Sequence, residues 1–200
     1  TDRGHIYADK IVVASHYPVD STLGLSFLKV YAEKSCGIAG KTSVKKFEGM
    51  YLSIDKTVRS LRYQKYNNQD ILLVGGGNHK VGAVDEESSY YKDLEEYVTR
   101  YFSKYEIISK WSTQDCMSYD KIPIIGNVDK SHKDIYVATG YNKWGMTSSA
   151  VAANIISSSI LDNSEKYNNI FSPNRNLNVS LNSVKEFGES SGNVVVGLVK

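Results

Sequence analysis

One segment of the sequence combines residue types and spacing that suit the binding of negative charge. A buried strand is expected over 135–139, the loop that follows is bounded by Gly140 and Gly145, and an apolar helix is expected directly after it. The first N–H groups of a helix have no partner within the helix and lie at the positive end of its dipole. Such an end binds an anion, or stabilises negative charge that develops during a reaction. This segment is the strongest candidate site, and the alternative is an ordinary strand-to-helix turn.

Two glycine-rich segments match nucleotide-binding loops only in part. Residues 140–147 superficially fit GxxxxGK[ST], but Met146 stands where the phosphate-binding Lys is required. Residues 75–77 follow an expected strand, lack the third Gly of GxGxxG and precede no helix. A tight turn or a β-bulge is the better interpretation of that second segment.

Histidine and cysteine are too scattered to predict a metal site or a disulfide framework. Cys36 and Cys116 stand far apart, with no CxxC motif and no Cys/His cluster, so we interpret them as free thiols in a reducing compartment. His79 lies beside the glycine segment, where its side chain could reach a cleft. An isolated His is more often a surface or satisfied core residue.

The composition excludes several classes of protein. Lys and Arg number 24 against 22 Asp and Glu, so the net charge is +2 and nucleic acid is not an expected partner. No apolar run approaches the roughly 20 residues that cross a bilayer, and no signal peptide opens the chain. With 41% hydrophobic residues the chain can bury a core, and we expect a globular cytoplasmic protein with no membrane span.

Hydrophobic periodicity predicts an α+β fold with a mostly antiparallel sheet and packed helices. A strand buried on both faces is expected within 6–14 and a short helix over 24–34. Closely spaced turn residues predict an antiparallel meander, with strands at 37–40, 49–54, 60–63 and 70–74.

Helices are predicted over about 86–104, with Asp85 as N-cap, and over about 145–161, which is apolar or small all round and is therefore expected to be buried. Further strands are predicted at 106–111 and 135–139. Residues 163–182 are rich in Asn and Ser and predict a surface linker.

Four segments resemble one enzyme family in sequence, order and spacing. These segments are residues 12–18, 111–115, 120–126 and 137–147. They resemble the C-terminal half of FAD-dependent oxidoreductases of the D-amino-acid oxidase and glycine oxidase (DAO) class. The stretch Gly-Tyr-Asn-Lys-Trp-Gly-Met-Thr at 140–147 is most similar to the branch in which the flavoprotein is fused to a C-terminal Rieske iron–sulfur domain. The resemblance covers about residues 5–175.

The resemblance implies an interleaved two-domain fold. It assigns 1–19 to the last strands of an FAD-binding domain, 20–120 to a substrate domain, 121–165 to the FAD-binding domain again, and 166–200 to a linker toward a Rieske-like domain. The FAD diphosphate-binding segment and the ligands of a 2Fe-2S cluster are not among these residues. The resemblance therefore implies that the natural protein continues at both ends, and that this fragment alone is inactive.

The resemblance also implies roles for particular residues. Backbone groups at the start of the second helix would stabilise negative charge on the flavin when a hydride arrives at N5, and these belong to Trp144, Gly145, Met146 and Thr147. Gly140, at the start of the preceding loop, is also expected to bind the cofactor. Three residues would pass beside the flavin ring, namely Pro123, Ile125 and Gly126. Arg62 and His79 would line the opposite wall of the substrate cleft.

Two departures from the family pattern affect the expected substrate. The family's Arg in Gly-x-Arg-Pro, which clamps a substrate carboxylate, has no counterpart in 112–115, and Lys143 stands where glycine oxidase has a second Arg. Lys143 can still meet an anionic group as a point charge.

The resulting hypothesis is an FAD-dependent oxidoreductase that oxidises a small amine or amino-acid-like substrate and passes electrons to a Rieske domain. The alternative is a non-catalytic binding or assembly module, which the 15 Tyr residues favour weakly.

Overall fold

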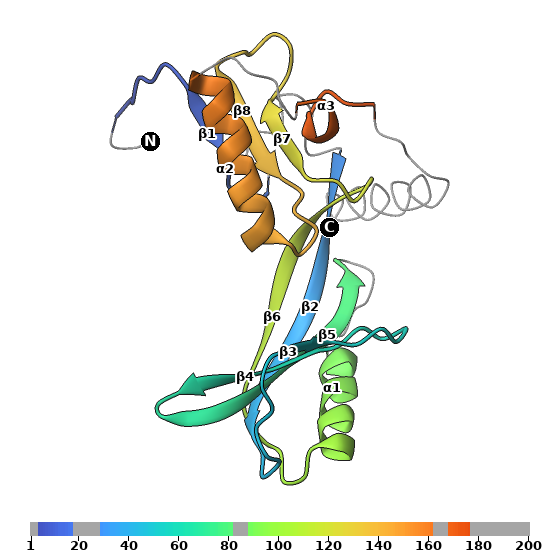
Figure 1. The fold of residues 1–200 in the computed structure, drawn as a ribbon. Coiled ribbons are helices and arrows are strands. Elements are labelled where there is room, and N and C mark those ends of the chain that lie inside the picture. Colours follow the sequence, from blue (N-terminus) through green and yellow to red (C-terminus); the bar gives the residue numbers. More distant parts are fainter. Residues whose placement is uncertain (1–3, 18–28, 82–87, 162–167, 177–200) are drawn as a thin grey trace. The chain divides into compact units, whose positions relative to one another are not determined.

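The chain forms two compact units, each built around its own sheet (Figure 1). The computed structural model describes residues 4–17, 29–81, 88–161 and 168–176. Unit 1 consists of Thr1–Tyr31 together with Asp115–Lys200, and unit 2 consists of Ala32–Gln114. Within the described ranges, no helix is long and apolar enough to cross a membrane.

Unit 2 is organised around a five-stranded sheet. The strand order is β3-β4-β5-β2-β6, with bounds Met50–Leu52, Ser60–Tyr66, Gln69–Lys80, Val30–Lys41 and Glu106–Ser118. Pairing is antiparallel between β3 and β4, between β4 and β5, and between β5 and β2. Asn67 and Asn68, with φ of 47° and 58°, form the two-residue hairpin turn between β4 and β5.

A β-bulge interrupts the pairing of β5 with β2, and this confirms the bulge interpretation of the glycine segment. The register shifts between Lys34 and Cys36, opposite the part of β5 that contains Gly77. Gly77 has φ +62°, and a Cβ there would lie 2.9 Å from the Cβ of Tyr90. Both the backbone conformation and the close approach of the helix therefore require glycine.

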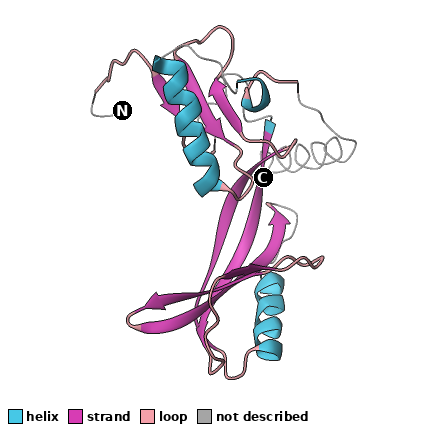
Figure 2. Ribbon diagram, viewed as in Figure 1, coloured by secondary structure: helices cyan, strands magenta, loops and turns pink. Residues whose placement is uncertain are grey.

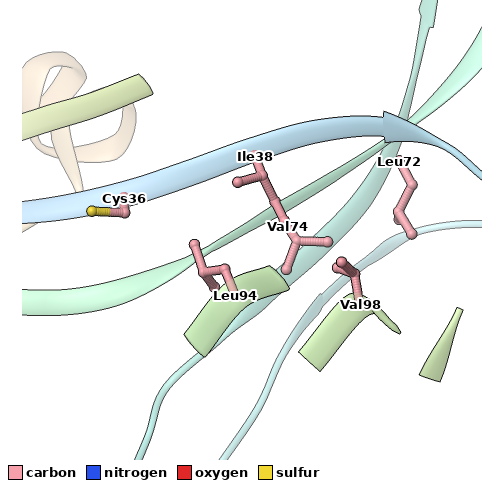
Figure 3. Close-up of a cluster of buried hydrophobic side chains, with 6 residues drawn as sticks. All are labelled: Cys36, Ile38, Leu72, Val74, Leu94 and Val98. Carbon is pink, nitrogen blue, oxygen red and sulfur yellow. The ribbon is translucent and has the colours of Figure 1, made fainter. Parts of the chain in front are cut away.

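The core of unit 2 joins the sheet to helix α1 (Ser88–Tyr101), as Figure 3 shows. Residues two apart on a strand and four apart on a helix share a face. That spacing describes the buried set, which is Cys36 and Ile38 from β2, Leu72 and Val74 from β5, and Leu94 and Val98 from α1. Burial of this one face is what holds α1 on the sheet.

Unit 1 contains a three-stranded sheet covered by helix α2 (Figure 2). The order is β1-β8-β7, with bounds Ile11–Val13, Ile135–Thr139 and Ile124–Asn127. Strand β1 runs parallel to β8, whereas β7 is antiparallel to β8. Helix α2 (Gly145–Leu161) packs one face on this sheet, and its buried apolar contacts are Ala152, Ile155 and Ile156 against Ile125, Tyr136 and Ala138. The short helix α3 spans Asn168–Phe171.

The mostly antiparallel α+β fold is confirmed, and so are the bounds predicted for β8 and α2. Residues 30–34 do not form the predicted helix, because they pair as the first part of β2, with Glu33 opposite Lys80. Residues 24–28 of that predicted helix and the N-cap Asp85 lie outside the described residues.

Two elements are less buried than their sequences predict. Ile11 and Val12 of β1 are exposed, because β1 is an edge strand of its sheet. Helix α2 buries one face only, so that Val151 and Leu161 remain exposed.

Replacing Leu94 by Ala should destabilise unit 2 by about 2–5 kcal/mol, because it leaves a cavity between α1 and the sheet. Urea unfolding gives the free energy of unfolding. The exposed Glu96 on the same helix provides the matched control, since Glu96→Ala removes no core contact. Equal losses in the two variants would contradict the assigned core.

Candidate functional site

Three loops of unit 1 lie at the same edge of its sheet. Residues 14–17 follow β1, residues 140–144 follow β8 and residues 119–123 precede β7. Because β1 is parallel and β7 antiparallel to β8, all three loops emerge at the carboxyl end of the two parallel strands. Ligands of open α/β sheets bind at such an edge.

The backbone of these three loops is strained. Among the described residues, seven non-glycine residues have positive φ, and four of them are in these loops: His16 at 66°, Lys121 at 61°, Asn142 at 50° and Lys143 at 70°. The left-handed conformation costs an L-residue roughly 1–2 kcal/mol. It persists where surrounding contacts fix it, which is common at functional sites.

The Asn142 side chain fixes the loop after β8. Its Oδ1 accepts a hydrogen bond from the backbone N–H of Ser118 at 3.0 Å. Its Nδ2 donates to Ser118 Oγ at 2.9 Å and to the Gly140 carbonyl at 2.8 Å. Ser118 is fully buried. One amide group therefore ties the end of β6 to the loop that leads into α2.

Thr139 connects the same region to the loop after β1. The Thr139 hydroxyl donates to the carbonyl of His16 at 2.5 Å and lies 3.3 Å from the sulfur of Cys116. Burial is the main influence on the Cys116 thiol and raises its pKa. Cys116 is thus a structural thiol rather than a nucleophile.

The N-terminus of α2 is open. Trp144 N–H donates to the Tyr141 carbonyl at 2.8 Å, and α2 begins at Gly145. Trp144 and Met146 are 66% and 91% exposed. A Cβ built on Gly145 would have its nearest neighbour, a Tyr141 ring carbon, at 4.0 Å, so this position faces open space. Unpaired N–H groups beside an exposed indole fit the anionic edge of a flat aromatic group.

The residues expected beside a flavin take different positions in the structure. Ile125 is fully buried in the core under α2, so its side chain is not available to a ligand and only its backbone is. Gly126 is buried with φ +134°. Pro123 is half-buried, and its carbonyl accepts a hydrogen bond from Arg175.

Lys143 forms an ion pair that the sequence analysis did not predict. Its Nζ lies 3.9 Å from Oδ2 of Asp115, and the two side chains are 28% and 22% exposed. The backbones are held side by side, because Asn142 N–H donates to the Cys116 carbonyl. An anionic ligand at Lys143 must therefore compete with the carboxylate of Asp115.

Arg62 and His79 lie in unit 2, well apart from each other. Arg62 pairs with Leu73, six residues before His79 along β5, which corresponds to about 20 Å. Nδ1 of His79 donates to the Gly77 carbonyl at 2.7 Å, and the imidazole stacks on Tyr90 with centroids 4.1 Å apart. His79 thus stabilises the bulge. In the tautomer whose Nδ1 donates to Gly77, Nε2 is a hydrogen-bond acceptor.

Arg175 contributes to unit 1 in a way that the sequence pattern around it does not indicate. The range 163–182 was predicted to be a surface linker, of which the structure describes 168–176. There Pro173 is fully buried and Arg175 forms a buried ion pair with Asp120. No local pattern reveals this pair, because its partners are 55 residues apart.

Comparison with known proteins places these features in a family. The sequence matches the protein family described as "DAO: FAD dependent oxidoreductase" over residues 1–159. A curated relative from Bacillus subtilis (strain 168), named "Putative Rieske 2Fe-2S iron-sulfur protein YhfW", is 39% identical over 175 residues, which cover 87% of this chain and 34% of the relative. The chain thus spans about a third of the length of that relative.

Solved structures show the same fold. Glycine oxidase from Geobacillus kaustophilus aligns with a TM-score of 0.67 at 18% identity, covering 84% of this chain and 46% of that one. Fructosyl peptide oxidase from E. terrenum aligns with a TM-score of 0.61 at 10% identity, covering 87% and 47%. The described units therefore have the architecture of DAO-type flavoproteins.

Asn142→Ala and Asn142→Gly should differ in stability. Both leave the buried N–H of Ser118 without its partner, at a cost of about 1–3 kcal/mol, but only Ala is strained at φ 50°. We expect Gly to be the milder change by about 1 kcal/mol. Chemical denaturation measures both values, and Asn154→Ala on the exposed face of α2 is the control. Equal losses would show that strain is not held at Asn142.

Proposed function

The chain belongs to the DAO family of FAD-dependent oxidoreductases, and from that premise we propose that it is part of an enzyme that oxidises a small amine or amino-acid-like substrate. The bond oxidised is C–N, and the hydride is transferred to FAD. The observation that carries the proposal is the open N-terminus of α2, at the sheet edge where the strained loops gather.

We assign unit 1 to the FAD-binding domain and unit 2 to the substrate domain. The parallel pairing of β1 with β8 supports the first assignment, because β1 leaves an apolar edge on which a further parallel strand can pair. The chain covers less than half of the solved glycine oxidase. On this proposal the diphosphate-binding segment and any Rieske domain belong to other parts of a longer protein. Residues 177–200, expected to lead toward the Rieske domain, lie outside the described residues.

The residues of unit 1 fit the flavin that the family implies. When bound, FAD would supply a hydride acceptor at N5 and a pyrimidine edge on which negative charge would develop. On this proposal the N–H groups of Gly145, Met146 and Thr147 stabilise that charge, and their position at the positive end of α2 supports the assignment. On this proposal Trp144 and the turn at Gly140 border the space through which the flavin reaches the start of α2. On this proposal Pro123 and Gly126 pass beside the flavin ring, and Ile125 contributes only its backbone, because its side chain is buried in the core.

Lys143 is our proposed contact for an anionic group of the substrate. Its pairing with Asp115 leaves the two side chains together nearly neutral, so the site holds a carboxylate less firmly than an arginine fork would. This supports a substrate whose carboxylate is weakly bound or absent. We propose Arg62 and His79 of unit 2 as further contacts for the substrate.

We also propose an electron acceptor for the enzyme and a cellular compartment in which it works. The curated relative is named as a Rieske protein, which supports onward electron transfer to a 2Fe-2S cluster in another part of the protein. Within the described ranges, no group of three or more His, Cys, Asp or Glu residues is placed to hold a metal ion. The two buried free thiols support a reducing compartment such as the cytoplasm.

A binding or assembly role is the second candidate, and one observation favours it. The edge strand β3 exposes apolar residues along its length and just beyond it, namely Met50, Tyr51, Leu52 and Ile54. Absorbance spectroscopy of the full-length protein separates the two functions. Flavin bands before or after incubation with FAD support the oxidoreductase, and their absence after reconstitution leaves the binding role.

Gly145→Asp should weaken FAD retention in the full-length protein, because it places a carboxylate at the end of α2 that would bind the flavin. Gly145→Ala is the matched control, since the added Cβ has its nearest neighbour at 4.0 Å. Flavin content per protein after gel filtration measures retention. If the Asp variant retains as much flavin as the Ala variant, the assigned flavin site is wrong.

Lys143→Gln should weaken the binding of acetate, used as a carboxylate probe, by about tenfold. Asp115→Asn should strengthen it severalfold, because it releases Lys143 from its ion pair. Titration of the flavin absorbance in the full-length protein measures both dissociation constants. Lys133→Gln, on the exposed β7–β8 loop, is the control. The proposal requires the dissociation constant for acetate to rise in Lys143→Gln and to fall in Asp115→Asn. A change in the same direction in both variants would contradict the pairing.

A further inference from the structure

Arg175 uses every nitrogen of its guanidinium group in hydrogen bonds. Nε donates to Asp120 Oδ2 at 2.7 Å, and Nη2 donates to Asp120 Oδ1 at 2.8 Å and to the Ile122 carbonyl at 2.7 Å. Nη1 donates to three further carbonyls, those of Pro123, Phe171 and Ser172, at 3.1–3.2 Å. One side chain thus ties the segment after α3 to the loop that precedes β7.

The ion pair between Arg175 and Asp120 is buried, so it is favourable only if its hydrogen-bond geometry is good. The side chains of Arg175 and Asp120 are 9% and 7% exposed. Burial alone would raise the pKa of Asp120, but the hydrogen bonds from Arg175 and from the Ile122 N–H outweigh it and lower that pKa. A buried ion pair contributes little net stability compared with apolar packing, and a role in fixing local geometry is the hypothesis followed here.

The bonds from Arg175 determine the shape of the loop rather than merely its position. They fix the carbonyls of Ile122 and Pro123, and each fixed carbonyl sets the plane of one peptide group. Pro123 has no N–H of its own to hold this stretch. Lys121, with φ +61°, adds strain that the clamp must offset.

This loop leads directly into the candidate flavin site. Pro123 is followed by β7, and β7 pairs with β8 in register up to Thr139, the residue before Gly140. The segment that carries Arg175 is itself anchored, because Pro173 is fully buried and its carbonyl accepts a hydrogen bond from Lys29 at 2.6 Å.

We propose that Arg175 is a positioning residue of the cofactor site, which holds residues 120–123 in the conformation that presents Pro123 and the start of β7 to the flavin. This inference rests on the proposed function. On this inference residues 168–176 support the cofactor site of unit 1 and are not a linker.

The test uses the full-length protein with Arg175→Ala, Arg175→Lys and Asp120→Asn. The dissociation constant for FAD and the visible spectrum of the bound flavin are measured well below the melting temperature of each variant. We expect Arg175→Ala to raise the dissociation constant about tenfold and to shift the flavin bands. Lys should recover only part of the loss, because an ammonium group cannot form the planar fork. Arg100→Ala on the exposed face of α1 is the control.

The outcomes separate this inference from the proposed function. A wild-type protein that binds no FAD overturns the proposed function, and the inference with it. A wild-type protein that binds FAD overturns the inference alone if Arg175→Ala lowers only the melting temperature and leaves the flavin spectrum and affinity unchanged. Complete recovery with Lys also overturns it, because charge alone would then suffice.

Discussion

The conformation of one asparagine determines how the chain passes from β8 into α2. Between Thr139 and Gly145 the backbone must leave a buried strand, reverse, and begin a helix whose first N–H groups face outward. That path requires left-handed residues in succession, and Asn142 and Lys143 provide them. Asn is the residue type best suited to the first, because its amide can satisfy backbone groups locally while tolerating positive φ. The hydrogen bonds to Ser118 and Gly140 then hold a conformation that an unsupported loop would relax.

A second support acts on the neighbouring loop in a different way. Around Asn142 the chain is held by short neutral hydrogen bonds between residues on adjacent backbones. Before β7 it is held by a charged side chain that comes from 55 residues farther along. The edge of the unit 1 sheet is thus assembled from distant parts of the sequence, and its loops keep their shape without regular secondary structure of their own. This is the preorganisation that an electrostatic site requires.

Local pattern predicted those elements whose environment is simple. Strand β8 is a short apolar run between polar turns, and α2 begins at a glycine and lacks charged residues, so their bounds follow from the sequence. The residues of the α1 core follow from helical spacing in the same way.

Features set by long-range pairing could not be predicted. Residues 30–34 carry no strand alternation, and they belong to β2, in which Glu33 and Lys34 pair with Lys80 and His79 of β5. Strand β5 continues through Gly75–Gly77 because the bulge lets the ladder resume beyond Gly77. In the candidate site, the motif residues were found by resemblance, whereas Asp115 and Arg175 depend on partners that no local spacing reveals.

The route of the chain through unit 2 has a consequence for how such proteins diversify. Unit 2 is a single continuous stretch, Ala32–Gln114, inserted within unit 1. The strands by which the chain enters and leaves it, β2 and β6, are neighbours in one sheet. An insertion whose two ends lie side by side can be lengthened, shortened or replaced without changing the path of the chain through unit 1. Selection can thus remodel one unit extensively while the loops and helix start of the other keep their sequence.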